Sequence, residues 1–430
     1  MNASNKKKPQ SVSVVLGNNC LSVGRLDFIV KGNRESSAFT YDQRWLAETK
    51  SFDLAPNVPR KAVQHFAYGG RGDHALLGIF SDAAPDSWGR RLLRRKYGEG
   101  LSELDYLLLS DDETRLGALR FLDGKGQPLT VSDEPVPRVA DLGYLTQLAH
   151  RFVQDPASAK EEADKLVGVA GSAGGARPKA NIRDEKTSAL WIAKFTEYCE
   201  DLPTERVEVA TLALAENAGL RAPEARLELG QTDIPVGVFK RFDRTADGRR
   251  LHYMSARSAL GKKQDEQGYY SEIAQVLQSY SVAPEKDMHE MWARMVFSIL
   301  VRNTDDHLKN HGFVYARDGK WRLSPLFDVN PQPTRVPKME TGISPEHGFE
   351  PDIRAAIEAG PLFLIEEDEA ARSTARIAQS ISANWQEELR AQGVLNNHLK
   401  LYVDAFEHDE MEYALRMADT PIMARKSHLR

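Results

Sequence analysis

The spacing of hydrophobic residues changes along the chain, and each change predicts a different kind of structure. Residues 11–30 (SVSVVLGNNCLSVGRLDFIV) alternate between apolar and polar positions on both sides of the turn residues GNN. This alternation predicts a β-hairpin that opens a first domain. Residues 81–98 (SDAAPDSWGRRLLRRKYG) predict a loop followed by a helix, which should end near Gly98.

A proline-containing stretch at residues 129–142 (LTVSDEPVPRVADL) predicts a connector near residue 135. We therefore expect a first domain of mixed α and β structure over residues 1–135. Short apolar strands and one helix follow, and beyond about residue 270 most segments have helical spacing. This order predicts an α+β protein with a β-rich lobe over residues 136–246 and a mostly helical lobe over residues 247–430.

The β-rich lobe is predicted to contain short strands around a single helix. Strands are expected at residues 179–184, 188–196, 225–230 and 234–244. The helix is expected at residues 202–220 (LPTERVEVATLALAENAGL), because Pro203 suits its first turn and Gly219 its C-terminal end.

The densest cluster of polar groups follows an apolar helical run at residues 291–302 (MWARMVFSILVR). The next eight residues, NTDDHLKN at 303–310, hold two acids, a histidine, a lysine and two asparagines. Downstream, the dipeptide DG at residues 318–319 stands between two alternating segments and predicts a two-residue hairpin turn. In that turn Arg317 pairs with Lys320.

The predicted pairing determines which residues meet elsewhere in this hairpin. Its apolar side chains should share one face: Val314, Ala316, Trp321 and Leu323. The same register places Asn310 opposite Phe327, so Asn310 and Asp328 should meet at the open end. Asp305 lies in the loop that leads in.

An amide and two carboxylates at one point predict a magnesium-dependent site. Mg²⁺ takes hard oxygen ligands and typically uses one or two carboxylates together with substrate phosphates. The remaining acid can orient and deprotonate a hydroxyl. A catalytic-loop Asp with an Asn five residues later is the spacing of protein-kinase-like phosphoryl transfer, and Asp305 and Asn310 have it. The alternative is a polar loop whose Asp and Asn side chains cap turns.

A kinase-like site needs further parts, and the chain has candidates for them. Residues 171–180 (GSAGGARPKA) form a glycine-rich segment whose backbone can approach phosphate closely, although a flexible turn is the alternative. Lys194 is a charge at the end of an apolar strand, where a phosphate-contacting lysine is expected. Glu208, near the start of the next helix, is the expected partner of that lysine, and Glu205 is the alternative.

Composition narrows the class of protein. The net charge of −5 over 430 residues predicts no general attraction to nucleic acid. The basic run in residues 89–98 (GRRLLRRKYG) is typical of a solvated helix face, with phosphate binding as the alternative. Two cysteines without a CxxC motif argue against a thiolate zinc site and a disulfide framework. No apolar run reaches the roughly 18 residues of a membrane span, so a cytoplasmic protein without membrane contact is expected.

These stretches resemble those of the HipA-type toxin kinases, serine/threonine kinases that are paired with an antitoxin. SAGGARPKA resembles the family's phosphate-binding loop, VFKRFDR its hinge strand, NTDDHLKN its D-x-H-x-K-N catalytic loop and SPLFDV its metal-binding acid segment. VGRLDF, SAFTYDQRWLA and APDSWGRRLL resemble its N-terminal domain. The resemblance covers nearly the whole chain and implies a mixed α/β domain before a bilobal protein-kinase-like domain.

The resemblance also implies roles for the matching residues of the catalytic loop. Asp305 is the expected catalytic base, and its spacing to Asn310 selects it over Asp306. His307 is expected to support the loop. Asn310 and Asp328 are the expected Mg²⁺ ligands.

The resemblance implies that the bound nucleotide is ATP and that Lys194 is a catalytic lysine that contacts its phosphates. The implied cofactor-binding residues are Ser172, Ala173, Gly174, Gly175, Lys179, Lys194, Glu208, Lys240, Arg241, Phe242, His307 and Asn310. Ser172 matches a loop serine that is autophosphorylated in characterised relatives. One departure is Pro178, where the best-known members carry an acid.

The implied function is that of a toxin that phosphorylates a protein and blocks translation. In relatives the acceptor is an aminoacyl-tRNA synthetase of the glutamyl type, and dormancy follows. The implied partner is a HipB-like helix-turn-helix antitoxin, and operator DNA should be bound only through that partner. The alternatives are a kinase of the same fold acting on another protein, a lipid or a small molecule, and a corepressor acting mainly through its antitoxin.

Overall fold

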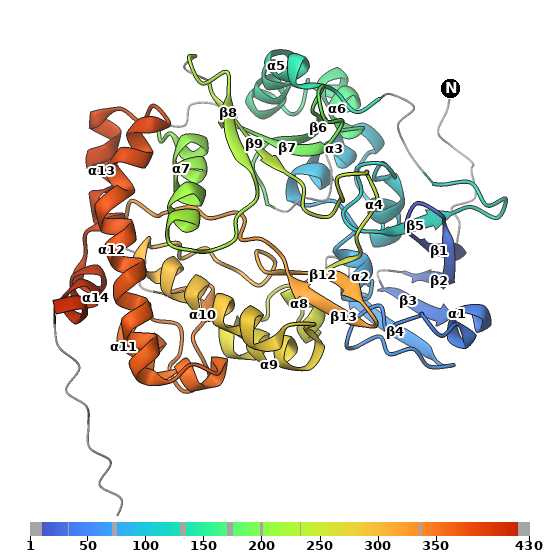
Figure 1. Cartoon of the computed structure of the whole chain (residues 1–430). Helices are drawn as coiled ribbons and strands as arrows, with labels where there is room; N and C mark the ends of the chain where they lie inside the picture. The colour runs from blue at the N-terminus through green and yellow to red at the C-terminus, as the bar shows by residue number, and fades with distance from the viewer. Residues whose placement is uncertain are drawn as a thin grey trace, which may run out of the picture. The chain divides into compact units, whose positions relative to one another are not determined.

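The structure is a computed structural model that describes residues 11–32, 34–70, 75–129, 135–169, 175–197, 201–232, 234–334 and 338–419. Its internal contacts divide the chain into two units, whose elements are labelled in Figure 1. Unit 1 comprises Met1–Asp201, Pro223–Glu266 and Lys309–Ser324. Unit 2 comprises Leu202–Ala222, Gln267–Leu308 and Pro325–Arg430. The chain therefore passes from unit 2 into unit 1 inside NTDDHLKN, between Leu308 and Lys309.

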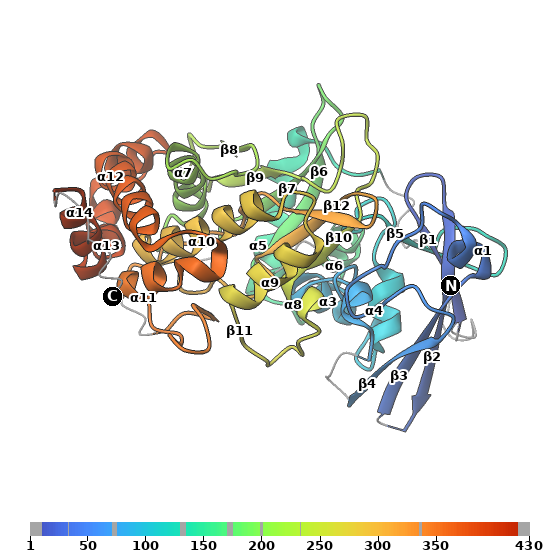
Figure 2. The same ribbon diagram turned by 60° about the horizontal axis from the view of Figure 1, so that its bottom comes forward.

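Unit 1 begins with a five-stranded antiparallel sheet in the order β4-β3-β2-β1-β5. Its strands are β1 (Ser11–Leu16), β2 (Leu21–Lys31), β3 (Arg34–Tyr41), β4 (Gln64–Gly70) and β5 (Leu119–Leu122). The hairpin predicted for residues 11–30 is confirmed as β1 and β2, and the left-handed backbone of Gly17 (φ +70°) helps to turn the chain between them. Figure 2 shows β2, β3 and β4 side by side, and among the described residues β4 pairs with β3 alone and is an edge strand.

Short helices follow in unit 1: α1 (Gln43–Ala47), α2 (Gly78–Ser81), α3 (Ser87–Tyr97) and α4 (Glu103–Leu109). The helix predicted before Gly98 is confirmed as α3. Asp86 caps its start, because its carboxylate accepts a hydrogen bond from the N–H of Gly89 at 2.8 Å. Gly98 adopts φ +91°, a conformation that a side chain would strain, so the helix ends there.

A second sheet of unit 1 confirms all the strands predicted for the β-rich lobe. It has the order β6-β7-β9-β8, with β6 (Lys179–Arg183), β7 (Leu190–Phe195), β8 (Ala225–Glu228) and β9 (Val236–Lys240). Helices α5 (Leu142–Gln154) and α6 (Lys160–Val167) contribute to the same hydrophobic core. Trp88 of α3, Phe152 of α5 and Trp191 of β7 are among its largest side chains, so α3 shares the core of this sheet.

The third sheet of unit 1 has the order β10-β12-β13, with β10 (Tyr253–Ser255), β12 (Gly312–Arg317) and β13 (Lys320–Leu323), and α8 (Ala256–Leu260) follows β10. Arg317 pairs with Lys320 as predicted. The rest of the predicted register is wrong by one residue, because the ladder shifts between Tyr315 and Arg317. Tyr315 pairs with Trp321, and Ala316 is left exposed.

The physical reason for the shift is burial of the first half of β12. Phe313 is 1% exposed and pairs with Leu323, which is equally buried, whereas Val314 pairs with Arg322. A bulge of one residue lets the larger aromatic ring enter the core while the turn keeps its own geometry. Val314 and Ala316 therefore do not form the apolar face that strict alternation predicted.

Unit 2 is built mainly from helices: α7 (Thr204–Asn217), α9 (Tyr270–Tyr280), α10 (Pro284–Leu300), α11 (Ile353–Glu358), α12 (Glu367–Ala391), α13 (Asn396–Phe406) and α14 (Asp409–Asp419). The predicted helix at residues 202–220 is confirmed as α7. The long helix α12 packs against α7, α10 and α14 (Figure 1). A short parallel pair joins β11 (Gly268–Tyr269) to β14 (Thr341–Gly342). In the part of the chain that the structure describes, no helix combines the length and apolarity needed to cross a bilayer.

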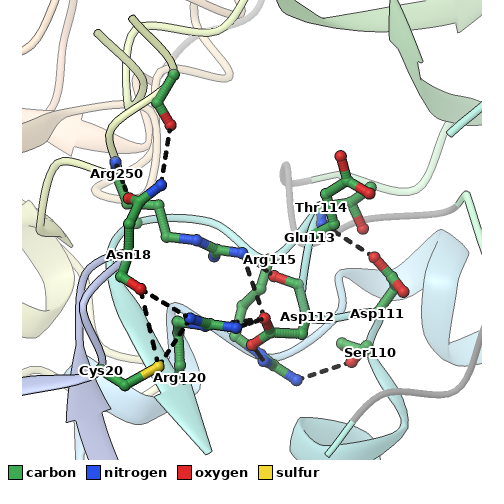
Figure 3. Close-up of polar contacts among 12 residues, drawn as sticks. Asn18, Cys20, Ser110, Asp111, Asp112, Glu113, Thr114, Arg115, Arg120 and Arg250 are labelled. Carbon is green, nitrogen blue, oxygen red and sulfur yellow. Dashed lines mark hydrogen bonds and ion pairs between the residues drawn. The ribbon is translucent and has the colours of Figure 1, made fainter. Parts of the chain in front are cut away.

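Buried ion pairs connect the first sheet of unit 1 with the segment after β9 (Figure 3). The carboxylate of Asp112 lies 2.7 Å from Arg120, 3.0 Å from Arg115 and 3.4 Å from Arg250. Arg115 is fully buried. Arg115 and Arg120 are close to Asp112 in sequence, whereas Arg250 is 138 residues away, so the carboxylate ties β5 to the chain that follows the second sheet.

Candidate active site

The two acids of the motif NTDDHLKN have different surroundings in unit 2. Asp306 is 1% exposed and accepts hydrogen bonds from the hydroxyls of Tyr270 and Ser298, the latter at 3.0 Å. Asp305 is exposed. Asp306 therefore anchors the loop to α9 and α10, while Asp305 is presented to ligands.

A second segment of unit 2 lies against this loop. The backbone N–H of Asn330 donates to the side-chain oxygen of Asn303 at 3.0 Å, and the N–H of Glu340 donates to the carbonyl of Thr304 at 2.9 Å. Asp328 precedes Asn330 by two residues and has a left-handed backbone, φ +59°. Its carboxylate accepts a weak hydrogen bond from the side chain of Asn330 at 3.4 Å. The loop of Asp305 and the segment of Asp328 are thereby held together.

The carboxylates of these two segments influence one another. Burial raises the pKa of Asp305 above its ordinary value, and the nearby charges of Asp328, Glu340 and Asp306 raise it further. His307 opposes this shift. A carboxylate whose pKa is raised by burial and by like charges favours a proton or a cation, which is what a general base beside a metal site requires.

The carboxylate oxygens around Asp305 and Asp328 are the kind of ligand that Mg²⁺ prefers. Oxygen donors predominate around Asp305 and Asp328, and their mutual repulsion would be relieved by a hard cation. Among the described residues no group of three or more His, Cys, Asp or Glu side chains is arranged as a metal cage. A site that completes its coordination with substrate phosphates does not need such a cage.

His307 lies in the same loop and is partly buried. Its backbone N–H donates to the carbonyl of Asp305 at 2.9 Å. Its Nδ1 atom is buried and has no hydrogen-bond partner among the described residues. This leaves a polar ring atom beside Asp305 that a ligand or an ordered water could satisfy.

The glycine-rich segment is described only from Gly175 onward. Ser172, Ala173 and Gly174, which the sequence implicates in nucleotide binding, lie outside the described residues. Gly175 has φ +92°, and a Cβ atom there would lie 2.9 Å from the ammonium of Lys179. The end of the segment therefore lies close to that lysine, and its positive φ favours glycine.

The start of α3 holds the end of the glycine-rich segment. The ammonium of Lys179 lies 3.1 Å from the carboxylate of Asp86, and both side chains are 4% exposed. The indole N–H of Trp88 donates to the carbonyl of Lys179 at 3.0 Å, and the backbone N–H of Trp88 reaches the carbonyl of Gly175 at 3.4 Å. Lys179, predicted to bind the cofactor, is thus held in a buried ion pair.

Sequence reasoning missed Asp86 and Trp88 as neighbours of the glycine-rich segment. The signal that could have raised them is the helix start PDSW, in which an N-cap acid precedes a buried tryptophan. Their partners are about ninety residues away in sequence, so the pattern alone does not name them.

Lys194 lies on β7 between Lys179 of β6 and Gly237 of β9. Its ammonium is 5.1 Å from the centre of the Phe239 ring, a distance typical of a cation–π contact. Lys194 is partly buried near the end of β7. The neighbouring strand β6 begins within the glycine-rich segment. This position is compatible with the predicted contact to phosphates.

The predicted hinge residues differ in how their side chains are used. Lys240 is exposed and pairs with Glu224 at 2.9 Å. Arg241 is 5% exposed, and its guanidinium binds Asp243 at 2.7 Å and the side chain of Asn181 at 2.7 Å. The Arg241 side chain is therefore committed to the interior of unit 1, and its backbone N–H donates to the carbonyl of Leu190 at 3.0 Å, which leaves its own carbonyl as the group that could contact a nucleotide.

The predicted site residues are divided between the two units. Unit 2 holds Asp305, His307, Asp328, Glu205 and Glu208, and unit 1 holds Lys179, Lys194, Asn310 and the hinge residues. The structure brings together the members within each unit as described. The meeting of Asn310 with Asp328, and of Lys194 with Glu208 or Glu205, stays a prediction. Both glutamates are buried in α7, so burial does not choose between them.

Comparison with known proteins identifies the relatives of this chain. The profile of the HipA-like C-terminal domain matches residues 171–385, half of the chain, and that of the HipA N-terminal domain matches residues 17–122. The chain belongs to the HipA family. The predicted resemblance is thereby confirmed, and it extends through both units.

Individual relatives agree with this HipA assignment. A Sinorhizobium fredii protein named as a candidate kinase, Y4dM, is 31% identical over 34% of this chain and 39% of its own length. A Haemophilus influenzae protein, also named as a candidate kinase, is 27% identical over 45% of this chain and 63% of its own length. The matches thus span less than two thirds of these two relatives.

The solved structure of HipA from Shewanella oneidensis MR-1, in a complex with HipB and operator DNA, shares the fold. It superposes with a TM-score of 0.69 over 95% of this chain and 96% of that chain, at 16% sequence identity. The predicted α+β fold class is confirmed.

Proposed function

We propose that this HipA-family chain is an ATP- and Mg²⁺-dependent protein serine/threonine kinase that acts as the toxin of a toxin–antitoxin pair. The observation that carries the proposal is the group of Asp305, Asp328 and Glu340 in unit 2, where burial and like charges raise the pKa of Asp305. Asp306 is committed to Tyr270 and Ser298, which leaves Asp305 as the acid that can receive a proton.

In the proposed reaction Asp305 accepts the proton of an acceptor hydroxyl as the hydroxyl oxygen attacks the γ-phosphorus of ATP. The bond between that phosphorus and the bridging oxygen breaks, and ADP leaves. Bound Mg²⁺, held by Asn310 and Asp328, would neutralise charge on the phosphates. Lys194 contributes a point charge on the phosphates, and the glycine-rich segment clamped by Asp86 contributes backbone N–H groups.

The proposed acceptor is an aminoacyl-tRNA synthetase, and its phosphorylation would inhibit translation and induce dormancy in the cytoplasm. Family membership supports this choice. The alternatives are another protein, a lipid or a small molecule, because a fold does not determine its substrate. Identification of phosphorylated molecules in cells that express the chain separates these cases.

A HipB-like helix-turn-helix antitoxin is the proposed partner, and operator DNA would be bound only through it. The solved HipA of Shewanella oneidensis MR-1 is in a complex with HipB and operator DNA, which supports this. A role limited to corepression predicts that Asp305 is dispensable for every phenotype, whereas the kinase proposal predicts that toxicity requires it.

The decisive experiment compares the parent chain with Asp305→Ala and with the control Asp368→Ala, which removes an exposed acid from the first turn of α12. We expect transfer of labelled phosphate from ATP to protein with the parent and the control, and none with Asp305→Ala. Equal transfer by Asp305→Ala and the parent would refute the assignment. Mapping of phosphosites in the parent tests whether Ser172 is autophosphorylated.

A further inference from the structure

Two cavities of unit 1 adjoin the residue that precedes Asn310. One of about 550 Å³ lies beside the starts of α3 and α4, and one of about 350 Å³ lies beside β4 and α8. Ser81, Gln264 and Lys309 line both. The cavities therefore adjoin at Lys309, and we call the two together the Lys309 groove.

Lys309 has an unusual position for a lysine. Among the described residues no partner forms a hydrogen bond or a close ion pair with its ammonium. The Lys309 side chain is also partly buried. A partly buried ammonium without a carboxylate partner costs free energy that an anionic ligand would recover.

The carboxylates that line the Lys309 groove are already committed. Asp82 accepts from the N–H and hydroxyl of Ser255 at 2.7 and 2.8 Å, and Asp86 pairs with Lys179. The remaining lining acids are also bonded: Glu103 to the guanidinium of Arg90 at 2.7 and 2.8 Å, and Glu35 to the N–H of Glu103 at 3.2 Å. None of them is placed to neutralise Lys309 fully.

The lining cations, by contrast, surround the groove at both ends. Arg91 and Arg94 line the larger cavity, and Lys262 and Lys263 line the smaller one. Arg94 is 40% exposed, and its ion pair with the exposed Glu99 is long at 4.0 Å. In a chain whose net charge is −5, this groove is locally basic.

The smaller cavity ends at the edge of the first sheet. Phe66 and Tyr68 of β4 line it, their rings stack with centres 6.1 Å apart, and they are 51% and 74% exposed. Within the part of the chain that the structure describes, β4 has a neighbour on one side only, so its other edge can pair with an extended chain. Exposed aromatic rings beside arginines and lysines are typical of surfaces that bind protein.

We propose that the Lys309 groove is the acceptor site and takes an extended, acidic segment of the protein to be phosphorylated, with a carboxylate on Lys309. This inference rests on the proposed kinase function and adds the class of acceptor. The sequence places Lys309 directly before the predicted Mg²⁺ ligand Asn310, which is why we assign the acceptor to this groove. Two adjoining cavities favour an extended chain over a small molecule.

The first test measures binding without catalysis, by fluorescence anisotropy of labelled peptides on the full chain. The probes are a short serine-containing peptide rich in Asp and Glu, its counterpart rich in Lys and Arg, and a single-stranded oligonucleotide of the same length. We expect the acidic peptide to bind best, and Arg94→Glu with Lys263→Glu to weaken it about tenfold. Tighter binding of the oligonucleotide or of the basic peptide would overturn the proposal.

A matched control is Lys125→Glu with Lys160→Glu, which makes the same change in charge at exposed positions of unit 1 outside the groove. Its affinity for the acidic peptide should stay within about twofold of the parent, because screening by salt weakens distant charges. An equal loss of affinity in the control variant would show that net charge alone controls binding of the acidic peptide, and the proposal would fail.

The variant Lys309→Met tests whether Lys309 binds the ligand or stabilises the fold. Removal of an ammonium without a partner should keep or raise the melting temperature while the preference for the acidic peptide is lost. A lysine that stabilises the fold predicts the opposite, a lower melting temperature with unchanged peptide binding, and that result would overturn the proposal.

The second test uses phosphoryl transfer to acidic and neutral acceptor peptides. We expect Arg94→Glu with Lys263→Glu to lower kcat/KM for the acidic peptide about tenfold and to leave KM for ATP unchanged. If the parent transfers phosphate without preferring acidic peptides, the groove proposal fails and the kinase proposal stands. If the parent transfers none, the kinase proposal fails, while anisotropy still decides what the groove binds.

Discussion

Asp305 of unit 2 and Asp243 of unit 1 are both aspartates, but their electrostatic surroundings are opposite. Burial would raise the pKa of Asp243, but Arg241 and Arg244 lower it far below its ordinary value. Burial also acts on Asp305, but there neighbouring carboxylates raise the pKa further. Asp112 in Figure 3 follows the pattern of Asp243, with arginines as partners and a lowered pKa.

The difference separates acids that hold the fold from acids suited to chemistry. A carboxylate whose charge is matched by arginines is stable as an anion and has little tendency to accept a proton. A carboxylate placed beside other carboxylates has that tendency and also attracts cations. Removal of one or the other should therefore affect stability and activity in opposite proportions.

The largest effect is expected for Asp305→Ala. Loss of the general base should lower the rate of phosphoryl transfer by about 10²- to 10⁴-fold. The free energy of unfolding should change little or increase, because repulsion among Asp305, Asp328 and Glu340 is relieved. Transfer rates and urea denaturation of the same samples check both parts. A variant that unfolds as easily as it loses activity would contradict the comparison.

Asp243→Ala should have its main effect on stability. It leaves the buried guanidiniums of Arg241 and Arg244 without their carboxylate, which was 2.7 and 2.6 Å away. Breaking a buried pair in this way typically costs about 3–5 kcal/mol. We expect a loss of this size in the free energy of unfolding, measured by urea denaturation. A loss below about 1 kcal/mol would mean that these arginines find other partners.

Both units should lose stability in acid through buried histidines. Burial lowers the pKa of His252 in unit 1 and of His408 in unit 2 to about 4, from the ordinary 6.5. Below pH 6.5 the unfolded chain takes up protons that the folded chain does not, until about pH 4. The free energy of unfolding should therefore fall between pH 6.5 and 4, by about 3 kcal/mol per histidine.

The two histidines can be told apart by single substitutions. His252→Gln and His408→Gln should each flatten the dependence of the unfolding free energy on pH within that window. Denaturation at pH 7 and pH 5 measures the slope. If neither substitution changes it, groups other than these histidines control the acid sensitivity.

Asp306→Ala tests the neighbour of the proposed base. It leaves the buried hydroxyls of Tyr270 and Ser298 without their acceptor, which should cost about 1–3 kcal/mol. Transfer per folded molecule should fall less than in Asp305→Ala, because the proton acceptor is retained. If Asp306→Ala lost more transfer than Asp305→Ala, Asp306 would be the catalytic base and Asp305 would be the supporting acid.

The smallest effect is expected for Asp247→Ala, which removes an exposed ion pair from the same unit as Asp243. The carboxylate of Asp247 lies 2.7 Å from Arg249, and both side chains are more than half exposed. Surface pairs of this kind contribute little to stability, because water and salt screen their charges. Urea denaturation of Asp247→Ala should give a curve close to that of the parent, and a loss of stability as large as that of Asp243→Ala would contradict the comparison.

Local chemistry determined much of what the sequence predicted. The hairpin at residues 318–319, the helix that stops at Gly98 and the helix after Pro203 follow from turn and cap residues that act on their immediate neighbours. The catalytic-loop motif was recognisable because its residues are contiguous. The membership of the chain in the HipA family is confirmed by the matches over both units.

Tertiary structure decided what depends on residues far apart in the chain. The bulge at Ala316 follows from burial of Phe313, which local alternation does not encode. The ion pair of Asp86 with Lys179 joins separate domains of the family, and the different settings of Asp305 and Asp306 depend on Tyr270, Ser298 and Asp328. A sequence states which charges exist, whereas their burial and partners, which set pKa and role, exist only once the chain is folded.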